Sequence, residues 1–369
     1  MKKTRFYAPQ LDSLRFLAFL LVLIHHSQYY EAIPLWVTIS KYGWMGVDLF
    51  LCLSAFLFAR LLYVEYQEKG DIHIGYFYLR RGLRIWPLYW FFFGLMLTLS
   101  IGQHGSNPYL WKRSLGMLTF TDNLVSMSLG YNLALLYSAH LWTISYEEQF
   151  YLVIPWALRA LYRLKKSAAF AILSALMLAG MAVRAAFIYF EVSHPAIWVF
   201  PLTHFESIFG GLMVGLGLFD APLKKIPAWL SFLAGLLALW SVTELPNVNA
   251  IQWKLMLTYP LIGLGMALIL SSVMRGGLGP LSLLFENKIL GYLGKISYGL
   301  YVYHLAGRQL AFEWTEALVS PQRLLVYPLV GTVLELLVTV AFSVASYELL
   351  EKPFLRLKER FAFIQTRPV

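Results

Sequence analysis

Cysteine and charge are both scarce in this sequence. One cysteine, Cys52, occurs among 369 residues, which excludes an internal disulfide framework and a cysteine-based metal cluster. Cys52 lies inside an apolar run, where a cysteine usually packs as a small buried side chain. Charged residues make up 14% of the chain, against roughly 25% in an ordinary soluble domain. This scarcity argues against a water-soluble enzyme of ordinary composition.

Apolar and aromatic residues are abundant instead. Hydrophobic residues reach 59% and aromatic residues 17%, with 12 tryptophans and 23 tyrosines, which suits a helix bundle in lipid with rings at both interfaces. The net charge is +10, but the lysines and arginines are spread over short segments between apolar runs. A nucleic-acid-binding surface would gather them on one face, so membrane topology explains them better.

Ten apolar runs are long enough to form membrane-spanning helices, each of which needs about 20 mostly apolar residues. The sequence therefore predicts an all-α, polytopic membrane helix bundle with about ten transmembrane helices. The stretch 102–140 contains no full span and could hold a re-entrant or interfacial helix on the outer side. The ten runs lie near 11–28, 44–64, 82–101, 141–160, 168–190, 202–219, 227–243, 255–273, 289–311 and 324–349.

The basic residues predict the orientation of the bundle, because cytoplasmic loops of membrane proteins are enriched in Lys and Arg. With ten spans and a cytoplasmic N-terminus, twenty of the thirty Lys and Arg residues fall on the cytoplasmic side and five in outer loops. We therefore expect both termini in the cytoplasm. Residues 1–355 are predicted to form a single transmembrane domain, and 356–369 a short basic cytoplasmic tail.

Ionisable side chains inside a span are energetically costly and mark candidate functional positions. In the first predicted helix Arg15 and His26 are eleven residues apart. At 100° per residue their side chains point in directions that differ by about 20° around the helix axis, so they share one face. At 1.5 Å per residue, Arg15 lies near the cytoplasmic surface and His26 about 16 Å farther into the membrane. Alternatively, Arg15 extends to the inner interface while His25 and His26 mark the outer helix end.

Two further spans carry carboxylates. Asp48 lies in the second span near its outer end, as either a favourable charge at a helix N-terminus or a partner for a cation or histidine. Glu147 and Glu148 enter the outer half of the fourth span together with Ser145. Adjacent glutamates in lipid need cavity water or polar partners. We therefore expect these carboxylates to face the interior of the bundle.

The third and ninth spans add cations, hydroxyls and a histidine. Arg81 and Arg84 lie about one turn apart at the cytoplasmic entry of the third span, where guanidinium groups could hold phosphates. They could equally be topology anchors that bind anionic lipid. In the ninth span Tyr298, Tyr301 and His304 follow at three-residue spacing along one flank. Such flanks are mostly ordinary packing, so it is the joint occurrence of these motifs that indicates a site.

Together these segments resemble the acyltransferase family 3 of integral membrane proteins, whose members transfer acyl groups from cytoplasmic acyl-CoA to acceptors of the cell envelope. The resemblance runs nearly end to end. The matching positions are Arg15 and His26, Gly46-Val47-Asp48, Arg81 and Arg84, Trp142–Tyr151, Ile296–His304 and Glu351-Lys352-Pro353.

The resemblance implies a membrane O-acyltransferase that moves an acyl group, commonly acetyl, from acyl-CoA to a hydroxyl of an envelope glycan or glycolipid. It implies a bacterial inner membrane, whose lipid would surround the apolar helices, while the spread of the basic residues already argues against a nucleic acid partner. The coenzyme A phosphates would stay at the cytoplasmic face with Arg15, Arg81 and Arg84. His26 would be the general base, or would itself be acylated and then deacylated by the acceptor.

The other candidate residues take supporting roles under this hypothesis. Either Glu147 or Asp48 would orient the imidazole or bind acceptor hydroxyls. No metal is required, and the histidines lack the tight spacing of metal ligands. The outer pocket would be shaped by Ser145, Tyr298, Tyr301 and His304.

Two other functional classes stay open. Intramembrane charges and aromatic cavities also describe the permeation path of a transporter or flippase for a lipid-linked sugar, although no inverted repeat is visible. The chain could also be a signalling or structural membrane protein whose arginines bind only lipid. Turnover of acyl-CoA by the purified protein separates both classes from the enzyme.

Overall fold

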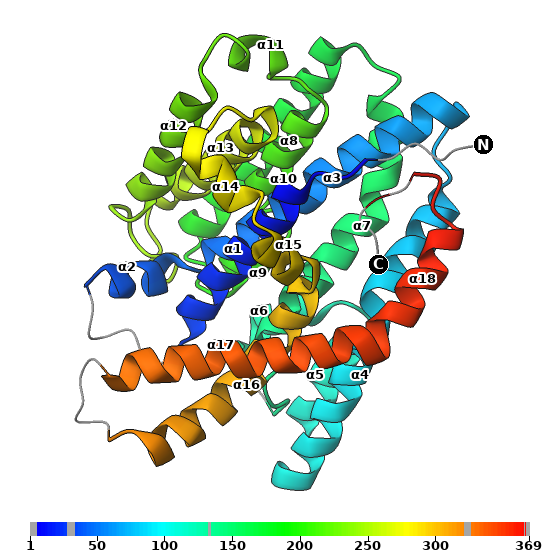
Figure 1. The fold of residues 1–369 in the computed structure, drawn as a ribbon. Coiled ribbons are helices and arrows are strands. Elements are labelled where there is room, and N and C mark those ends of the chain that lie inside the picture. Colours follow the sequence, from blue (N-terminus) through cyan, green and yellow to red (C-terminus); the bar gives the residue numbers. More distant parts are fainter. Residues whose placement is uncertain (1–5, 28–33, 132–133, 321–325, 365, 367–369) are drawn as a thin grey trace.

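The structure, a computed structural model, describes residues 6–27, 34–131, 134–320, 326–364 and 366. These residues form helices joined by turns and contain no strand, which confirms the predicted all-α class (Figure 1). The longer helices are α1 (Pro9–His26), α3 (Met45–Lys69), α4 (Ile74–His104), α7 (Trp142–Leu161), α8 (Lys166–Tyr189), α12 (Ala228–Val242), α13 (Leu255–Arg275), α16 (Ser297–Leu318) and α17 (Val326–Ser346). The shorter ones are α2 (Pro34–Tyr42), α5 (Pro108–Leu118), α6 (Asp122–Leu129), η1 (Ala139–Leu141), α9 (Ala196–Val199), α10 (Glu206–Gly215), α11 (Asp220–Leu223), η2 (Gly279–Leu281), α14 (Ser282–Phe285), α15 (Lys288–Lys295), η3 (Tyr347–Glu351) and α18 (Lys352–Arg360).

Five helices of the described chain are long and apolar enough to cross a membrane. They are α3, α4, α8, α13 and the continuous run Val326–Arg360, while α12 is apolar but shorter. Each of the ten predicted segments contains a helix, but α1, α7 and α16 carry charged side chains such as Arg15, Glu147 and Arg308, and α10 has only 10 residues. The chain is an integral membrane protein, and the count of ten spans stays a prediction.

Helix α1 packs closely against both α3 and α15, because glycines let the backbones approach. A Cβ atom at Gly46 of α3 would lie 2.3 Å from the carbonyl oxygen of Ala18. A Cβ atom at Gly294 of α15 would lie 1.7 Å from the carbonyl oxygen of Asp12. Small residues permit this approach of helices in membranes. The two glycines therefore fix the position of α1, which carries Arg15 and His26.

Helices α16 and α17 form a close pair, and α17 continues through η3 into α18 as one long run (Figure 1). The η3 segment is a π-helical turn, a feature that often occurs at functional sites. Glu351 lies in this turn, is buried, and faces Arg84 of α4 across 3.5 Å. The π turn thus places a carboxylate beside the arginines of the third predicted span.

Helices α5 and α6 lie in the stretch 102–140, where the sequence suggested an additional helix. Arg113 of α5 and Asp122 of α6 form a fully buried ion pair 3.0 Å long. Burial raises the pKa of Asp122 to about 6, against the opposing effect of the Arg113 guanidinium. This pair fastens the two short helices to each other. The outer location of this stretch stays a prediction.

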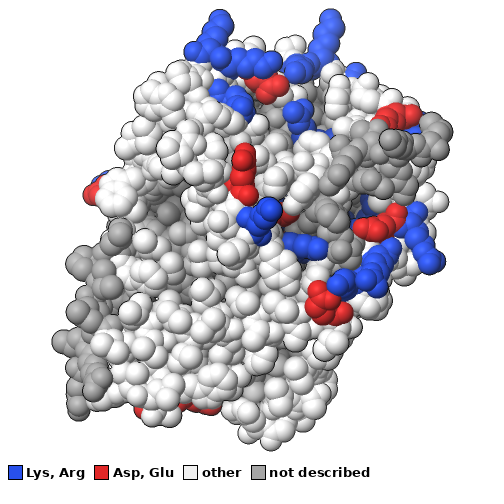
Figure 2. All heavy atoms as spheres, viewed as in Figure 1, with Lys and Arg blue, Asp and Glu red and all other residues white. Residues whose placement is uncertain are grey.

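Charged side chains are unevenly distributed over the face shown in Figure 2. Lys and Arg gather along the upper edge and at the right, whereas the lower part of this face is nearly free of charge. An asymmetry of this kind is what the enrichment of basic residues on one side of a membrane produces.

Candidate active site

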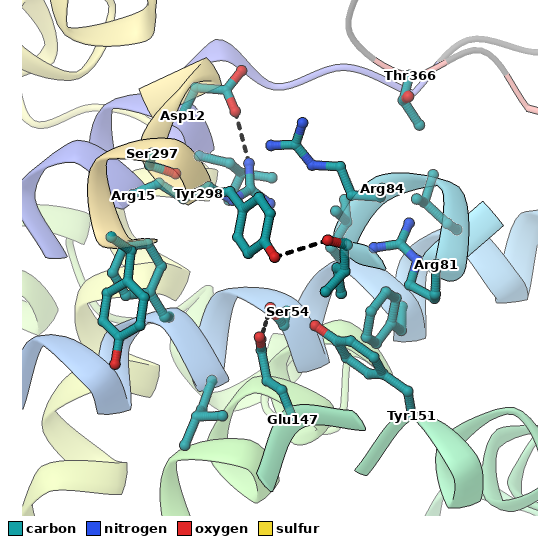
Figure 3. A pocket seen from close by; sticks show the side chains of 18 of the residues that line it. Asp12, Arg15, Ser54, Arg81, Arg84, Glu147, Tyr151, Ser297, Tyr298 and Thr366 are labelled. Carbon is teal, nitrogen blue, oxygen red and sulfur yellow. Dashed lines mark hydrogen bonds and ion pairs between the residues drawn. The ribbon is translucent and has the colours of Figure 1, made fainter. Parts of the chain in front are cut away.

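A cavity of about 180 Å³ lies among α1, α3, α4, α7 and α16 (Figure 3). A cavity needs roughly 10–15 Å³ to hold a single water, so this one is far larger than a packing defect. Apolar side chains of α3 line much of its wall. Convergent polar groups in a largely apolar pocket are the usual mark of a ligand site. The polar lining residues are Tyr7, Asp12, Arg15, Ser54, Arg81, Arg84, Thr143, Glu147, Tyr151, Ser297, Tyr298, Tyr301, Lys358 and Thr366.

Three arginines point into this cavity from α1 and α4 (Figure 3). Arg15 Nη1 lies 2.7 Å from Asp12 Oδ1, and Arg84 lies 3.5 Å from Glu351. Arg81 differs, because its guanidinium lies 4.8 Å from the ring centre of Phe58 and no carboxylate of the described residues forms an ion pair with it. The cavity therefore contains a cation that is available to an anionic ligand.

Glu147 and Tyr298 also border the cavity. The Ser54 hydroxyl donates a hydrogen bond to Glu147 Oε1 at 3.0 Å, which holds this half-buried carboxylate against α3 (Figure 3). The Tyr298 hydroxyl donates to the carbonyl oxygen of Ile85 at 2.9 Å. The structure thus brings together six of the predicted site residues: Arg15, Arg81, Arg84, Glu147, Tyr298 and Tyr301.

Tyr301 and Thr143 separate the cavity from a cluster of histidines. Their hydroxyl oxygens are 2.6 Å apart, and the Tyr301 hydroxyl also donates to the carbonyl oxygen of His140 at 3.1 Å. The His140 and His304 rings lie 4.5 Å apart, and the His304 and His26 rings 4.9 Å apart. Tyr301 therefore borders both the cavity and the histidine cluster.

His26 occupies the end of α1 and is half-buried. Its Nδ1 atom lies 3.0 Å from the carbonyl oxygen of Val22 and 3.2 Å from Nε2 of His304. No described residue forms a hydrogen bond with its Nε2 atom. Arg308 Nη1 donates to the carbonyl oxygen of His26 at 2.7 Å, which ties the end of α1 to α16. The His26 ring is thus held by contacts at its Nδ1 atom, while its Nε2 atom has no hydrogen-bond partner among the described residues.

Asp48 and Ser145 lie outside the cavity. Asp48 is 1% exposed, and its Oδ1 atom accepts a hydrogen bond from Ser207 at 2.7 Å and lies 2.8 Å from His204 Nε2. Ser145 Oγ accepts a hydrogen bond from the backbone nitrogen of Asp122 at 3.3 Å, at the start of α6. Neither residue contacts His26 or the arginines. Their predicted roles have no geometric support, whereas their places in helix packing are clear.

Several residues at the site did not stand out in the sequence as site candidates. Lys358 and Thr366 border the cavity, although they belong to the segment predicted as a separate tail. Arg308 and Glu335 lie near the end of α1, and Glu335 of α17 is fully buried with Arg308 as an electrostatic neighbour. Glu335 is the sole charged residue of α17, so a search for isolated charges within spans would have found it.

The residues that the structure describes contain no group of three or more His, Cys, Asp or Glu side chains arranged to hold a metal ion. The functional groups at the site are the arginines, the Glu147 carboxylate, the tyrosine hydroxyls and the histidine cluster. Such groups can bind phosphates, remove a proton from a hydroxyl and donate hydrogen bonds.

Comparison with known proteins bears on this arrangement. The family model described as an acyltransferase domain matches residues 9–348. A protein of Staphylococcus aureus (strain COL) named "Putative O-acetyltransferase" is 26% identical over all of this chain, which spans 60% of its length. A protein of Acidianus two-tailed virus named "Putative acetyltransferase" is 28% identical over 82% of this chain and 84% of its own.

A third relative is the peptidoglycan O-acetyltransferase of Listeria monocytogenes, 28% identical over 42% of this chain and 25% of its own. The chain thus spans about three fifths of the length of the staphylococcal relatives that it matches. No solved structure matches the chain.

Proposed function

Because the chain belongs to the acyltransferase family whose model covers residues 9–348, we propose that it transfers an acyl group, acetyl in the first instance, from acyl-CoA to a hydroxyl of an envelope glycan or glycolipid. The names of its relatives include O-acetyltransferases and one peptidoglycan O-acetyltransferase, which supports a glycan as the class of acceptor. The membrane that we propose is the bacterial inner membrane.

The cavity with its three arginines is the observation that carries this proposal. Coenzyme A has several phosphate charges that cannot enter lipid unpaired. Arg81 is backed by Phe58 and has no carboxylate partner among the described residues, so its planar guanidinium can take a phosphate with two parallel hydrogen bonds. Arg15 and Arg84 are held beside it by Asp12 and Glu351. In this proposal the pantetheine arm would enter the cavity of about 180 Å³ that these arginines border.

The proposed topology agrees with entry of acyl-CoA from the cytoplasmic side. With ten spans and both termini in the cytoplasm, the arginine end of the cavity opens to the side where acyl-CoA is made. His26 lies eleven residues farther along α1, about 16 Å closer to the outer face. The thioester would reach the histidine cluster through the Tyr301 boundary, and the acceptor would approach from the opposite side. Donor and acceptor then meet inside the bundle.

The transfer itself needs a base. In our proposal His26 takes the proton of the acceptor hydroxyl while the hydroxyl oxygen attacks the thioester carbonyl. The carbon–sulfur bond then breaks, and His26 passes the proton to the leaving thiolate of coenzyme A. Positioned bases of this kind contribute about 10²–10⁴-fold in rate. In a second form of the mechanism, His26 attacks the thioester and carries the acyl group before the acceptor removes it.

Radiolabelled acetyl-CoA and the purified protein in detergent test this proposal with a panel of envelope glycans. We expect His26→Ala to lower turnover by about 10²–10⁴-fold, the contribution of a positioned base, without changing the melting temperature. His25→Ala is the matched control, because its ring lies next to that of His26 and its Nδ1 atom is placed against the carbonyl oxygen of Ser40. Equal turnover by the unmodified chain, His26→Ala and His25→Ala would show that His26 takes no part in the mechanism. Binding of lipid-linked sugar without any acyl transfer would favour the transporter or flippase instead.

A further inference from the structure

The hydrogen bonds of the histidine cluster determine which ring nitrogen of His26 can act as a base. A neutral imidazole has one N–H donor and one nitrogen with a lone pair, and its surroundings decide which is which. A base needs the lone pair on the nitrogen that meets the reacting hydroxyl. The tautomer of His26 is therefore part of the mechanism, and the atoms around it fix that tautomer.

The assignment starts at His304, which is fully buried on α16. Its Nδ1 atom lies 2.6 Å from the carbonyl oxygen of Tyr301. A carbonyl oxygen can only accept a hydrogen bond, so this nitrogen is the one that carries the proton. The Nε2 atom of a neutral His304 then has the lone pair and can only accept.

The tautomer of His26 follows from that of His304. Its Nδ1 atom faces two acceptors, the carbonyl oxygen of Val22 at 3.0 Å and Nε2 of His304 at 3.2 Å. A lone pair at Nδ1 would put acceptor against acceptor at both contacts, so Nδ1 carries the proton and donates to them. The lone pair is left on Nε2, with which no described residue forms a hydrogen bond.

We infer that His304, together with the backbone carbonyl of Val22, sets the tautomer of His26 and so makes Nε2 the basic atom of the site. His304 is thus a positioning residue for the proposed reaction, on which this inference rests, instead of part of the acceptor pocket. The two carboxylates considered for this task lie elsewhere: Glu147 bonds to Ser54, and Asp48 to His204 and Ser207. Among the described residues, His304 is the side chain that hydrogen-bonds to the His26 ring.

The arrangement also serves the protonated state of His26. When Nε2 takes a proton, Nδ1 keeps its proton and continues to donate to His304 and Val22, so no hydrogen bond has to be rebuilt. A base whose ring is held by a third group in this way follows the general logic of oriented catalytic histidines. The backbone bond from Arg308 to His26 holds the same end of α1 in place.

Kinetics of two His304 variants test the role in catalysis. His304→Leu removes the acceptor, and we expect kcat to fall about 10²-fold, within the range that a positioned base contributes. The KM for acetyl-CoA should stay within about twofold, because the lost interaction does not contact the donor. His304→Gln retains an acceptor oxygen and should restore part of kcat. The melting temperature of each variant separates these effects from misfolding, and His25→Gln is the control.

Nitrogen NMR of protein labelled with ¹⁵N-histidine tests the tautomer without any turnover. The His26 signals, identified by their loss in His26→Ala, should show a pyrrole-like Nδ1 and a pyridine-like Nε2 in the unmodified chain. His304→Leu should shift part of the population to the other tautomer, because only the Val22 carbonyl then remains to favour a proton on Nδ1. A pyridine-like Nδ1 in the unmodified chain, or an unchanged pattern and kcat in His304→Leu, would overturn the inference. Because this measurement needs no substrate, failure of the proposed activity is distinguishable from failure of the tautomer assignment.

Discussion

Two polar regions contact α3, and each contains charged side chains within predicted spans, but among the described residues only one of the two borders the cavity. On one side of α3, Ser54 and Phe58 face the arginine cavity. On the other, Asp48 faces α10, where it contacts Ser207 and, just before that helix, His204. The cavity is open and contains a cation with no carboxylate partner among the described residues. The Asp48 network is closed to solvent: Asp48 is 1% exposed and its Oδ1 atom has two partners, while its Oδ2 atom is buried with no hydrogen-bond partner among the described residues.

The two regions also differ in the hydrogen bonds of their histidines, His204 and His26. His204 has an acceptor at each ring nitrogen, Asp48 Oδ1 at 2.8 Å and the carbonyl oxygen of Trp198 at 3.2 Å, and its ring stacks on Trp198 at 3.6 Å. His26 has acceptors at one nitrogen only and is half-buried. In this protein the cavity beside Arg81 and Glu147 is therefore what distinguishes the candidate reactive region from the packed Asp48 network.

The largest expected effect is in the closed network. Asp48→Ala leaves the Ser207 hydroxyl and the His204 ring without their acceptor, at about 1–3 kcal/mol for each buried donor. We expect a clear fall in melting temperature, measured by intrinsic fluorescence in detergent, and an unchanged KM for acetyl-CoA in the protein that stays folded. Asp48→Asn, which keeps one acceptor oxygen, should lose less. A fall in kcat at an unchanged melting temperature would instead give Asp48 the catalytic role considered from the sequence.

The opposite pattern is expected in the open cavity. Arg81→Ala removes a guanidinium that we propose for phosphate binding, so the KM for acetyl-CoA should rise about 10–100-fold, as hydrogen bonds to charged groups contribute about 1.5–3 kcal/mol. The melting temperature should change little. Acetyl-pantetheine, which lacks the nucleotide phosphates, is the matched control, and its KM should not respond to the substitution. Equal losses for both donors would show that Arg81 shapes the cavity without binding phosphate.

The sequence predicted the helical class and the arginine end of the site because both depend on local patterns. Apolar runs of span length give helices, and Arg81 and Arg84 share a face of one helix whatever surrounds them. The pairing of Asp48 with His204 could not be read in this way, since it joins residues 156 positions apart. The same holds for His26 and His304, which are 278 positions apart. These contacts depend on how α1, α3, α10 and α16 pack, which periodicity within one helix does not encode.

The smallest expected effect is at the rim of the cavity, where Lys358 of α18 is half-exposed. Charges that water can reach contribute about 0.2–1 kcal/mol, so Lys358→Ala should raise the KM for acetyl-CoA by no more than about fivefold. The effect should vanish at high salt, because the screening length falls to about 3 Å at 1 M. Arg356→Ala is the matched control, since Arg356 is exposed on the same helix but does not line the cavity. A loss with Lys358→Ala that persists in 1 M salt would mean that this lysine is desolvated against the donor, in which case α18 belongs to the binding site itself.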